Sequence, residues 1–260
     1  MAFGKTDSDR EIIRVEDLSL GYNTTAILEN INFSVYAGEI VTILGSSGSG
    51  KSTLLKGMIG LLAPMKGKIF LHGEDITGDK SFGIHERKRS IGVLFQSGAL
   101  LGSFNLNENI ALPLREYGAL PEDLVKEIVR LKLQLVHLES YGDYMPADLS
   151  GGMQKRAGLA RAMALDPEVL FCDEPTAGLD PVTGSEIDRL LIEFNRTLGI
   201  TMVVVTHELG SIEAISHRSI MLDMEQKGIV AIDTPERLKS ENRSPRVQAF
   251  FRRKPVDQIE

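Results

Sequence analysis

The segment GSSGSGKST at residues 45–53 constrains this chain more than any other, and it directly follows an apolar run at residues 40–44. It fits the pattern G-x-x-x-x-G-K-[ST], with a strand-like run before it and a helical pattern after it. Because glycine tolerates positive φ, Gly45, Gly48 and Gly50 would allow successive N–H groups to point at one phosphate group. The pattern predicts a phosphate-binding loop between a strand and a helix. The alternative, a flexible Gly/Ser turn, does not account for that context.

Two side chains of this loop have separate expected roles. Lys51 would reach the β- and γ-phosphates of a nucleotide, and the Ser52 hydroxyl would ligate Mg²⁺. The start of the following helix would add partial positive charge. The loop residues expected to hold ATP are Gly45, Ser46, Ser47, Gly48, Ser49, Gly50, Lys51, Ser52 and Thr53.

A second signal is VLFCDEP at residues 169–175, an apolar run that ends in two acids. Ligands bind at the carboxyl ends of strands in open α/β folds, which places these acids at a binding edge. Asp173 is expected to hold Mg²⁺ through its water shell, and Glu174 to orient and deprotonate an attacking water. Strands often end in acids that only face solvent, so this interpretation depends on the phosphate loop.

Short β-type runs alternate with helical patterns, which is typical of an α/β fold with a largely parallel sheet. The predicted strands are residues 12–15, 31–35, 40–44, 69–71, 91–95, 169–172 and 202–205. One helix with an apolar face is predicted from the spacing of Ile187, Leu190, Leu191, Phe194 and Leu198.

The strand signal is absent between residues 97 and 166, where we expect a helical insertion. Pro121 suits a first helical turn, and an apolar face follows it. The residues of that face are Leu124, Val125, Ile128, Val129 and Val136. After residue 240 the chain is polar and charged except at residues 247–251, which predicts a tail with one docking helix.

The composition argues against several classes of protein. There are 36 acidic and 29 basic side chains, a net formal charge of −7, which argues against a general nucleic-acid binder. The single cysteine, Cys172, cannot form an internal disulfide and lacks the companions of a metal site, so we expect a buried strand residue. No apolar run is long enough to span a bilayer, and residues 1–10 do not resemble a secretory signal. A cytoplasmic protein is expected.

LSGGM at residues 149–153, followed by QKRAGLARAMA, resembles the signature sequence of ABC ATPases, usually written LSGGQ. An N-capped helix start would look similar, but other residues occur in that family's order. Gln96 stands at its Q-loop, Asp180 at its D-loop and His207 at its switch histidine, while Tyr22 stands where an aromatic ring stacks on adenine. Each alone would be an ordinary packing or edge residue. Together they extend over nearly the whole chain and identify it as a member of that family.

The resemblance implies an α/β ABC ATPase, which is a P-loop NTPase. Its RecA-like core would carry an N-terminal antiparallel β subdomain and an inserted α-helical subdomain. We expect one ATPase domain over residues 1–240, with the core at 1–96 and 167–240 and the helical subdomain at 97–166. A C-terminal tail would occupy residues 241–260.

The resemblance also implies a homodimer of head-to-tail domains, with ATP and Mg²⁺ between the phosphate loop of one copy and the signature of the other. Ser150 and the Gly151 and Gly152 amides would bind the γ-phosphate in trans. Gln96 would also report nucleotide state to the helical insertion, near which membrane subunits would dock, at residues 96–115. The implied catalytic residues are Glu174, His207, Gln96 and Lys51; the nucleotide contacts outside the phosphate loop are Tyr22, Ser150, Gly151, Gly152 and Asp180; the Mg²⁺ site comprises Ser52, Gln96 and Asp173.

Within the family, residues 94–116, the LSGGM motif and the closing SPRVQAFF look like the Mla/Mce-type ATPases that drive phospholipid transport in the Gram-negative envelope. Met153 departs from the general signature but agrees with that subgroup. The resemblance implies permease subunits and an Mce-domain protein as partners, no nucleic acid, and a peripheral place on the cytoplasmic face of the inner membrane. Membrane contact would occur only through these partners, and residues 244–251 would reach across the dimer.

Other classes remain open at this point. An importer of amino acids or another small solute shares every catalytic motif. A soluble ABC ATPase of DNA repair or translation typically carries a long coiled-coil insertion or tandem ATPase domains, neither of which is visible here. A kinase or GTPase would not carry LSGGM and the switch histidine.

Overall fold

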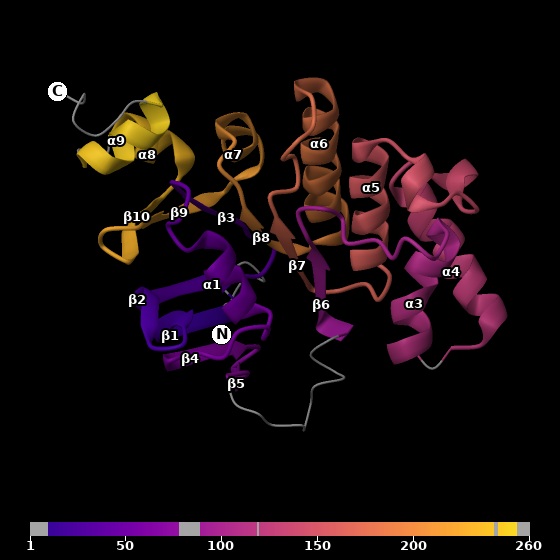
Figure 1. Ribbon diagram of the computed structural model, residues 1–260, viewed down its shortest axis with the longest axis horizontal. Coiled ribbons are helices and arrows are strands. Elements are labelled where there is room, and N and C mark those ends of the chain that lie inside the picture. Colours follow the sequence, from indigo (N-terminus) through magenta and orange to yellow (C-terminus); the bar gives the residue numbers. More distant parts are fainter. Residues whose placement is uncertain (1–9, 78–88, 119, 242–243, 254–260) are drawn as a thin grey trace, which may run out of the picture. The chain divides into compact units, whose positions relative to one another are not determined.

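The computed structural model describes residues 10–77, 89–118, 120–241 and 244–253 (Figure 1). The chain divides into two compact units. The first unit comprises Met1–Lys80 with Thr201–Glu260, and the second comprises Ser81–Ile200. Residues 1–9, which do not resemble a secretory signal, and residues 254–260 of the tail lie outside the described residues.

The first unit contains an antiparallel sheet with strand order β2-β1-β4-β5. Its strands are β1 Glu11–Tyr22, β2 Thr25–Tyr36, β4 Lys66–Leu71 and β5 Glu74–Asp75. Val15 of β1 pairs with Phe33 of β2 on one side and with Ile69 of β4 on the other. The three strands predicted in this region are confirmed, and the sheet is the antiparallel one that the family resemblance implies.

A second set of strands in the first unit runs in the order β10-β9-β3-β8. These are β3 Ile40–Gly45, β8 Thr201–Val205, β9 Arg218–Asp223 and β10 Gly228–Asp233. Strand β3 is parallel to β8 and to β9 and buries all six of its residues, as a continuous apolar run predicts. Helix α1 (Lys51–Met58) follows β3 and contacts β1, β3 and β8. The sequence patterns did not predict β9 and β10.

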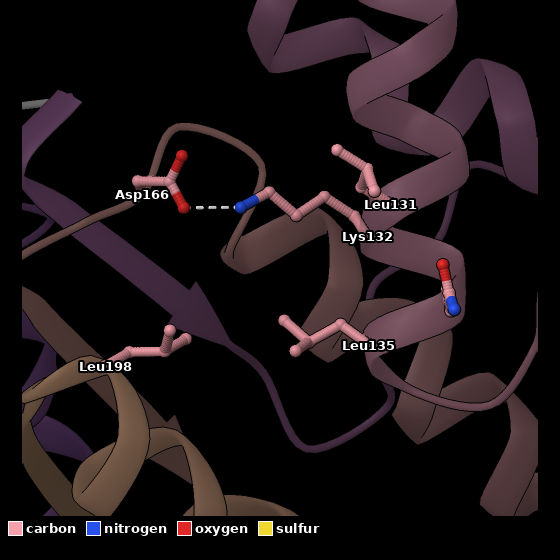
Figure 2. Close-up of a pocket in the computed structure, with 6 residues that line it drawn as sticks. Leu131, Lys132, Leu135, Asp166 and Leu198 are labelled. Atoms are coloured by element: carbon pink, nitrogen blue, oxygen red, sulfur yellow. Dashed lines mark hydrogen bonds and ion pairs between the residues drawn. The ribbon is translucent and has the colours of Figure 1, made fainter.

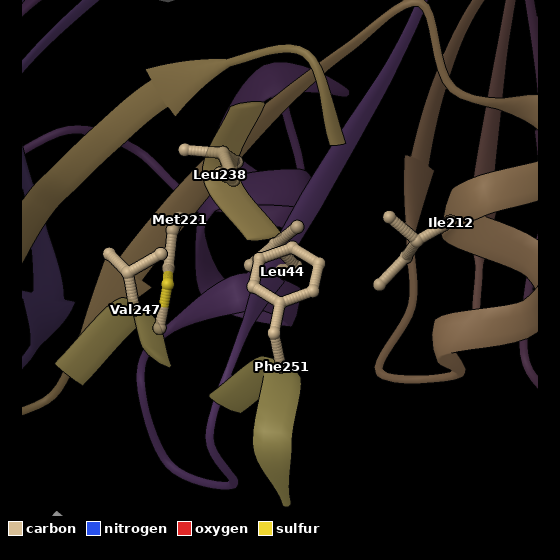
Figure 3. Packing of buried hydrophobic residues seen from close by; sticks show 6 residues of the cluster. All are labelled: Leu44, Ile212, Met221, Leu238, Val247 and Phe251. Atoms are coloured by element: carbon tan, nitrogen blue, oxygen red, sulfur yellow. The ribbon is translucent and has the colours of Figure 1, made fainter. Parts of the chain in front are cut away.

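Three short helices close the first unit: α7 Leu209–Ile215, α8 Pro235–Ser240 and α9 Pro245–Arg252. Helix α9 contacts α8 and buries Val247 and Phe251 in one apolar cluster with Leu44, Ile212, Met221 and Leu238 (Figure 3). The predicted docking helix is therefore confirmed, and it docks on its own chain. Its side chains pack behind Leu44, the residue that precedes the glycine-rich segment.

The second unit pairs two parallel strands with a group of helices. Strands β6 and β7 are in register from Ile91 opposite Val169 to Leu94 opposite Cys172. The elements are β6 Ile91–Leu94, α3 Leu106–Tyr117, α4 Glu122–Leu135, α5 Gly151–Ala162, β7 Val169–Asp173 and α6 Pro181–Leu198, with short 3₁₀ turns at Glu139–Tyr141 and Pro146–Asp148. In the described part of residues 97–166 there is no strand, as predicted. Cys172 is buried in β7, as expected.

Two predicted apolar faces are correct only in part. In α4, Val125 and Val129 are buried, but Leu124 is exposed, because the buried side of the helix follows Val125, Val129 and Leu133 at a spacing of four residues. Pro121 is the N-cap of this helix and lies just outside its first turn. In α6, four of the five predicted residues are buried, whereas Leu198 is 48% exposed at the last position before the left-handed Gly199. Among the described residues no helix is both long and apolar enough to cross a bilayer.

Candidate functional site

The glycine-rich segment forms a loop between β3 and α1. Gly45, Gly48 and Gly50 have φ values of 148°, 81° and 94°, a range that side-chain-bearing residues rarely adopt. A Cβ on Gly45 would lie 2.4 Å from the Leu222 carbonyl oxygen and 2.6 Å from Ser49 Oγ. Gly50 is the N-cap of α1, without a side-chain cap. The backbone therefore has the conformation that a phosphate-binding loop needs, and a helix N-terminus opens toward it.

Lys51 and the serines supply the polar groups of this loop. Lys51 Nζ donates to the carbonyl oxygens of Gly45 and Ser46, at 2.9 and 3.0 Å, so the ammonium lies over the loop. Ser49 Oγ is buried and has no hydrogen-bond partner in the described part of the chain. Ser52 is exposed at the first turn of α1, while Thr53 is buried. The Lys51 ammonium next to the loop backbone fits a phosphate ligand.

Two further candidate residues belong to the first unit. His207 lies two residues beyond β8, and the N–H of the preceding Thr206 donates to the Ile43 carbonyl oxygen at 3.2 Å. His207 therefore follows a strand that runs beside the strand carrying the loop, and its side chain is half-exposed. Tyr22 is the exposed last residue of β1. An exposed ring is available for stacking.

The paired acids end β7 in the second unit. Asp173 is the last strand residue and is partly buried. Glu174 is buried and has a φ of 49°, a left-handed conformation that is uncommon outside glycine. Its carbonyl oxygen accepts the Ala177 N–H at 3.2 Å. The chain thus turns sharply at Glu174, and backbone strain of this kind is common at functional sites.

The signature segment begins α5. Ser150 is its N-cap, and its hydroxyl accepts the Met153 N–H at 3.3 Å. Gly152 packs against Thr183 so closely that a Cβ would lie 2.4 Å from Thr183 Cγ2. Asp180 in turn caps α6 by accepting the N–H groups of Val182 and Thr183. The hydrogen bond from the Thr183 hydroxyl, ahead of those from backbone N–H groups, lowers the pKa of Asp180. The second unit therefore brings the signature and the segment around Asp180 together.

Gln96 lies two residues beyond β6 and is exposed. The segment that follows it is held by α5, because the Arg161 guanidinium donates to the carbonyl oxygens of Gly98 and Ala99 at 3.0 and 2.7 Å. Burial lowers the pKa of Arg161. A Cβ on Gly158 of the same helix would lie 3.1 Å from Gly98. One helix thus contacts the segment after Gln96 and begins at the signature serine.

Lys155 is a further residue of this helix, and sequence reasoning missed it. It is 5% exposed, and its Nζ donates to the Glu174 carbonyl oxygen at 2.9 Å. Burial lowers its pKa, and neighbouring acidic groups, Glu174 and Asp173 among them, oppose that shift. The available signal was its spacing of four residues from the apolar Leu159, which places a lysine on the buried face of the helix.

A cavity of about 400 Å³ lies elsewhere in the second unit (Figure 2). Its lining residues are Leu131, Lys132, Gln134 and Leu135 of α4, Asp166 in the loop before β7, and Leu198 at the end of α6. Lys132 is ion-paired with Asp166. None of the motif residues lines this cavity.

The sequence matches a family model described as "ABC transporter" over residues 28–177. It is 39% identical over 241 residues to the "Intermembrane phospholipid transport system ATP-binding protein MlaF" of Escherichia coli K12, covering 92% of this chain and 88% of that protein. It is 42% identical over 210 residues to the "Probable ribonucleotide transport ATP-binding protein mkl" of Mycobacterium leprae, covering 81% of this chain. The chain spans 60% of the length of the latter protein.

Solved structures resemble the fold over most of its length. The ATP-binding cassette MJ0796, in a dimeric post-hydrolysis state bound to ADP and Pi, superposes with a TM-score of 0.78 at 30% identity, covering 86% of this chain and 99% of that one. The protein cbiO1 of Clostridium perfringens, part of the ABC transporter complex cbiONQ, superposes with a TM-score of 0.80 at 31% identity, covering 89% of this chain and 92% of that one. Both structures confirm the fold class of the chain.

Proposed function

Because this chain belongs to the ABC transporter family, we propose that it is the ATP-hydrolysing subunit of a transporter that moves phospholipid across the bacterial envelope. The observation that carries this proposal is the identity of 39% to the phospholipid-transport protein MlaF over 92% of the chain. The positive φ of the loop glycines supports phosphate binding by the same chain. Transport of this kind would maintain the lipid asymmetry of an outer membrane.

ATP binding would begin at the phosphate loop. Its N–H groups and the Lys51 ammonium, which already lies over the loop, would hold the phosphates, and the exposed ring of Tyr22 would stack on adenine. The oxygen donors Ser52, Gln96 and Asp173 suit a hard divalent cation, and Mg²⁺ there would neutralise charge on the phosphates.

Hydrolysis would depend on Glu174. Its carboxylate would orient the attacking water and accept its proton, while Lys51 and His207 would stabilise charge on the transferred phosphoryl group. In a head-to-tail homodimer, Ser150 and the amides at the start of α5 would complete the site of the other copy. Asp180 would lie at the same interface. A post-hydrolysis dimer of a cassette with similar fold supports this arrangement.

The partners would be integral permease subunits together with an Mce-domain protein. The chain would then lie on the cytoplasmic face of the inner membrane and contact it only through these partners. Residues 96–115, which include the exposed Leu101 and Leu112, would form the docking region. In the dimer, residues 244–251 would also reach the other copy. Because Val247 and Phe251 are buried in their own chain, exposed residues of α9 would have to make that contact.

The experiment that tests this function is purification of the tagged chain from its native host after gentle solubilisation, followed by protein and lipid mass spectrometry. Recovery of a permease with an Mce-type protein and bound phospholipid is the expected result. Recovery of an amino-acid permease would overturn the lipid assignment and leave the ATPase intact. A ribonucleotide is the second candidate substrate, because the Mkl relative carries that description, and a co-purifying nucleotide permease would support it.

ATP binding has its own test. Replacing Lys51 with Ala removes the ammonium from the loop and is expected to weaken nucleotide affinity by about 10-fold or more. A titration with a fluorescent ATP analogue measures this directly. An unchanged affinity would remove Lys51 from the nucleotide site.

A further inference from the structure

Helix α5 carries a buried lysine in contact with the segment of the proposed general base. Lys155 lies on the face of α5 that is turned into the second unit, and its Nζ donates to the Glu174 carbonyl oxygen at 2.9 Å. The bond joins two residues 19 positions apart and is itself buried. Lys155 is therefore a long-range support for the turn that follows β7.

The acceptor of this bond belongs to a backbone in an unusual conformation. Glu174 has a φ of 49°, a conformation that costs a non-glycine residue energy unless its surroundings impose it. Two donors meet at its carbonyl oxygen, the Ala177 N–H at 3.2 Å and Lys155 Nζ at 2.9 Å. The first closes the turn locally, and the second ties the turn to α5. Together they fix the peptide plane next to the Glu174 side chain.

A buried cation is a costly way to fill this position. Removing an ammonium from water costs free energy, and an apolar residue of similar volume is often as stabilising or more so. The cost of the lysine is offset by a specific hydrogen bond to one carbonyl group and by the acids at the end of β7. This favours a role in geometry over a role in packing.

We infer that Lys155 is a positioning residue for Glu174, holding the backbone turn that aims the general base. The inference rests on the proposed function, because it needs Glu174 to act on water. Through Lys155, helix α5, which begins at the signature serine, contacts the general base of the same copy of the chain. Ser150 caps the start of α5, and Lys155 lies within the next two turns, so a displacement of the helix start moves the support of Glu174.

The test compares two lysine-to-methionine substitutions in the full-length protein. Lys155→Met removes the donor but keeps the volume. Lys132→Met is the matched control: Lys132 is also a buried lysine of the second unit, 8% exposed, and its partner is Asp166 (Figure 2). Steady-state ATP hydrolysis, affinity for a fluorescent ATP analogue and thermal unfolding are measured for both variants.

Lys155→Met is expected to lower kcat by about 10- to 100-fold, because a small misplacement of a catalytic group costs about that much. Its nucleotide affinity should stay within about threefold of wild type, and Lys132→Met should keep kcat within about twofold. Combined with Glu174→Gln, Lys155→Met should lower kcat no further, since both changes disable one base. Hydrogen exchange of the Ala177 amide should become faster in Lys155→Met and stay unchanged in the control Lys132→Met.

The results that would contradict the inference differ from those that would contradict the proposed function. Wild-type kcat in Lys155→Met, an equal loss in Lys132→Met, or additive losses with Glu174→Gln would overturn the inference and leave the proposed function standing. A wild-type chain without ATP hydrolysis, or near-normal hydrolysis in Glu174→Gln, would contradict the proposed function itself. If Lys155→Met does not fold, Lys155→Leu, which also removes the donor, takes its place with the same expected results.

Discussion

Two regions of the molecule hold polar groups in fixed positions: the phosphate loop of the first unit and helix α5 of the second unit. They do so in different ways. The loop uses backbone conformation: glycines at φ 148°, 81° and 94° turn the chain, and Lys51 contacts carbonyl groups only five and six positions before it. Helix α5 uses side chains: Lys155 and Arg161 reach carbonyl groups far away in sequence. The first arrangement suits binding, and the second holds the turn at Glu174 and the segment after Gln96 in place.

The difference predicts that substitutions in the two regions have different consequences. Changes at the loop should lower nucleotide affinity. Changes at α5 and at the turn after β7 should lower turnover while affinity is kept. Three substitutions test this division, and a fourth, Phe251→Ala, tests the packing behind the loop.

Glu174→Gln should have the largest effect on chemistry. The amide cannot accept the proton of the attacking water, so turnover should fall by about 10²- to 10⁴-fold. Steady-state ATP hydrolysis measures this change, with Glu186→Gln as a control, since Glu186 is a carboxylate of the same unit that pairs with Arg156. Near-normal turnover would remove Glu174 from the role of base.

Phe251→Ala should have the largest effect on stability. The side chain is 7% exposed and packs in the cluster that contains Leu44 behind the loop (Figure 3). Its truncation should lower the free energy of unfolding by about 3 kcal/mol. Phe250→Ala, at a partly exposed neighbouring ring, should cost clearly less. Chemical denaturation measures both, and equal losses would show that α9 does not anchor the unit in the way described.

Gly45→Ala tests the loop backbone itself. A Cβ would collide with the Leu222 carbonyl oxygen, and φ of 148° is poorly accessible to alanine, so a loss of about 1–3 kcal/mol in nucleotide binding is expected. Gly38→Ala is the control, because Gly38 also has positive φ but a Cβ added there would meet no atom within 4 Å. A fluorescent-nucleotide titration should show loss of affinity in the first variant only. Unchanged affinity in Gly45→Ala would mean that the loop tolerates a different backbone.

Arg161→Met should have the smallest effect. It removes the hydrogen bonds to Gly98 and Ala99 that hold the segment after Gln96, and each bond from a charged donor contributes about 1.5–3 kcal/mol before rearrangement. We expect turnover to fall by about threefold to tenfold with affinity unchanged, and exchange of the amides after Gln96 to become faster. A loss of affinity instead would break the division between the two regions.

Much of the fold follows from local patterns in the sequence. The loop could be predicted because its backbone needs glycines at fixed positions, and β3, β7 and β8 because buried parallel strands are continuous apolar runs. Strand β9 was missed because only Ile220, Met221 and Leu222 form its apolar run. Leu198 follows the helical period but lies at the helix end, where the period no longer determines burial.

The contacts of α5 could not be predicted in the same way. Lys155 and Arg161 contact residues 19 and 62–63 positions away, and no local pattern specifies such partners. The motif residues were found through family resemblance, whereas these two supporting residues lie outside the motifs. A charged residue on the apolar face of a predicted buried helix is the signal that such a contact leaves in a sequence.

We expect the phosphate loop to govern nucleotide affinity, and the turn at Glu174 with its support from α5 to govern chemistry. Calorimetric titration of ATP into wild type, Gly45→Ala and Glu174→Gln tests this expectation most directly. Glu174→Gln should bind ATP with an affinity within about threefold of wild type, and Gly45→Ala should bind at least about 5-fold more weakly. Comparable losses of affinity in both variants would contradict the account.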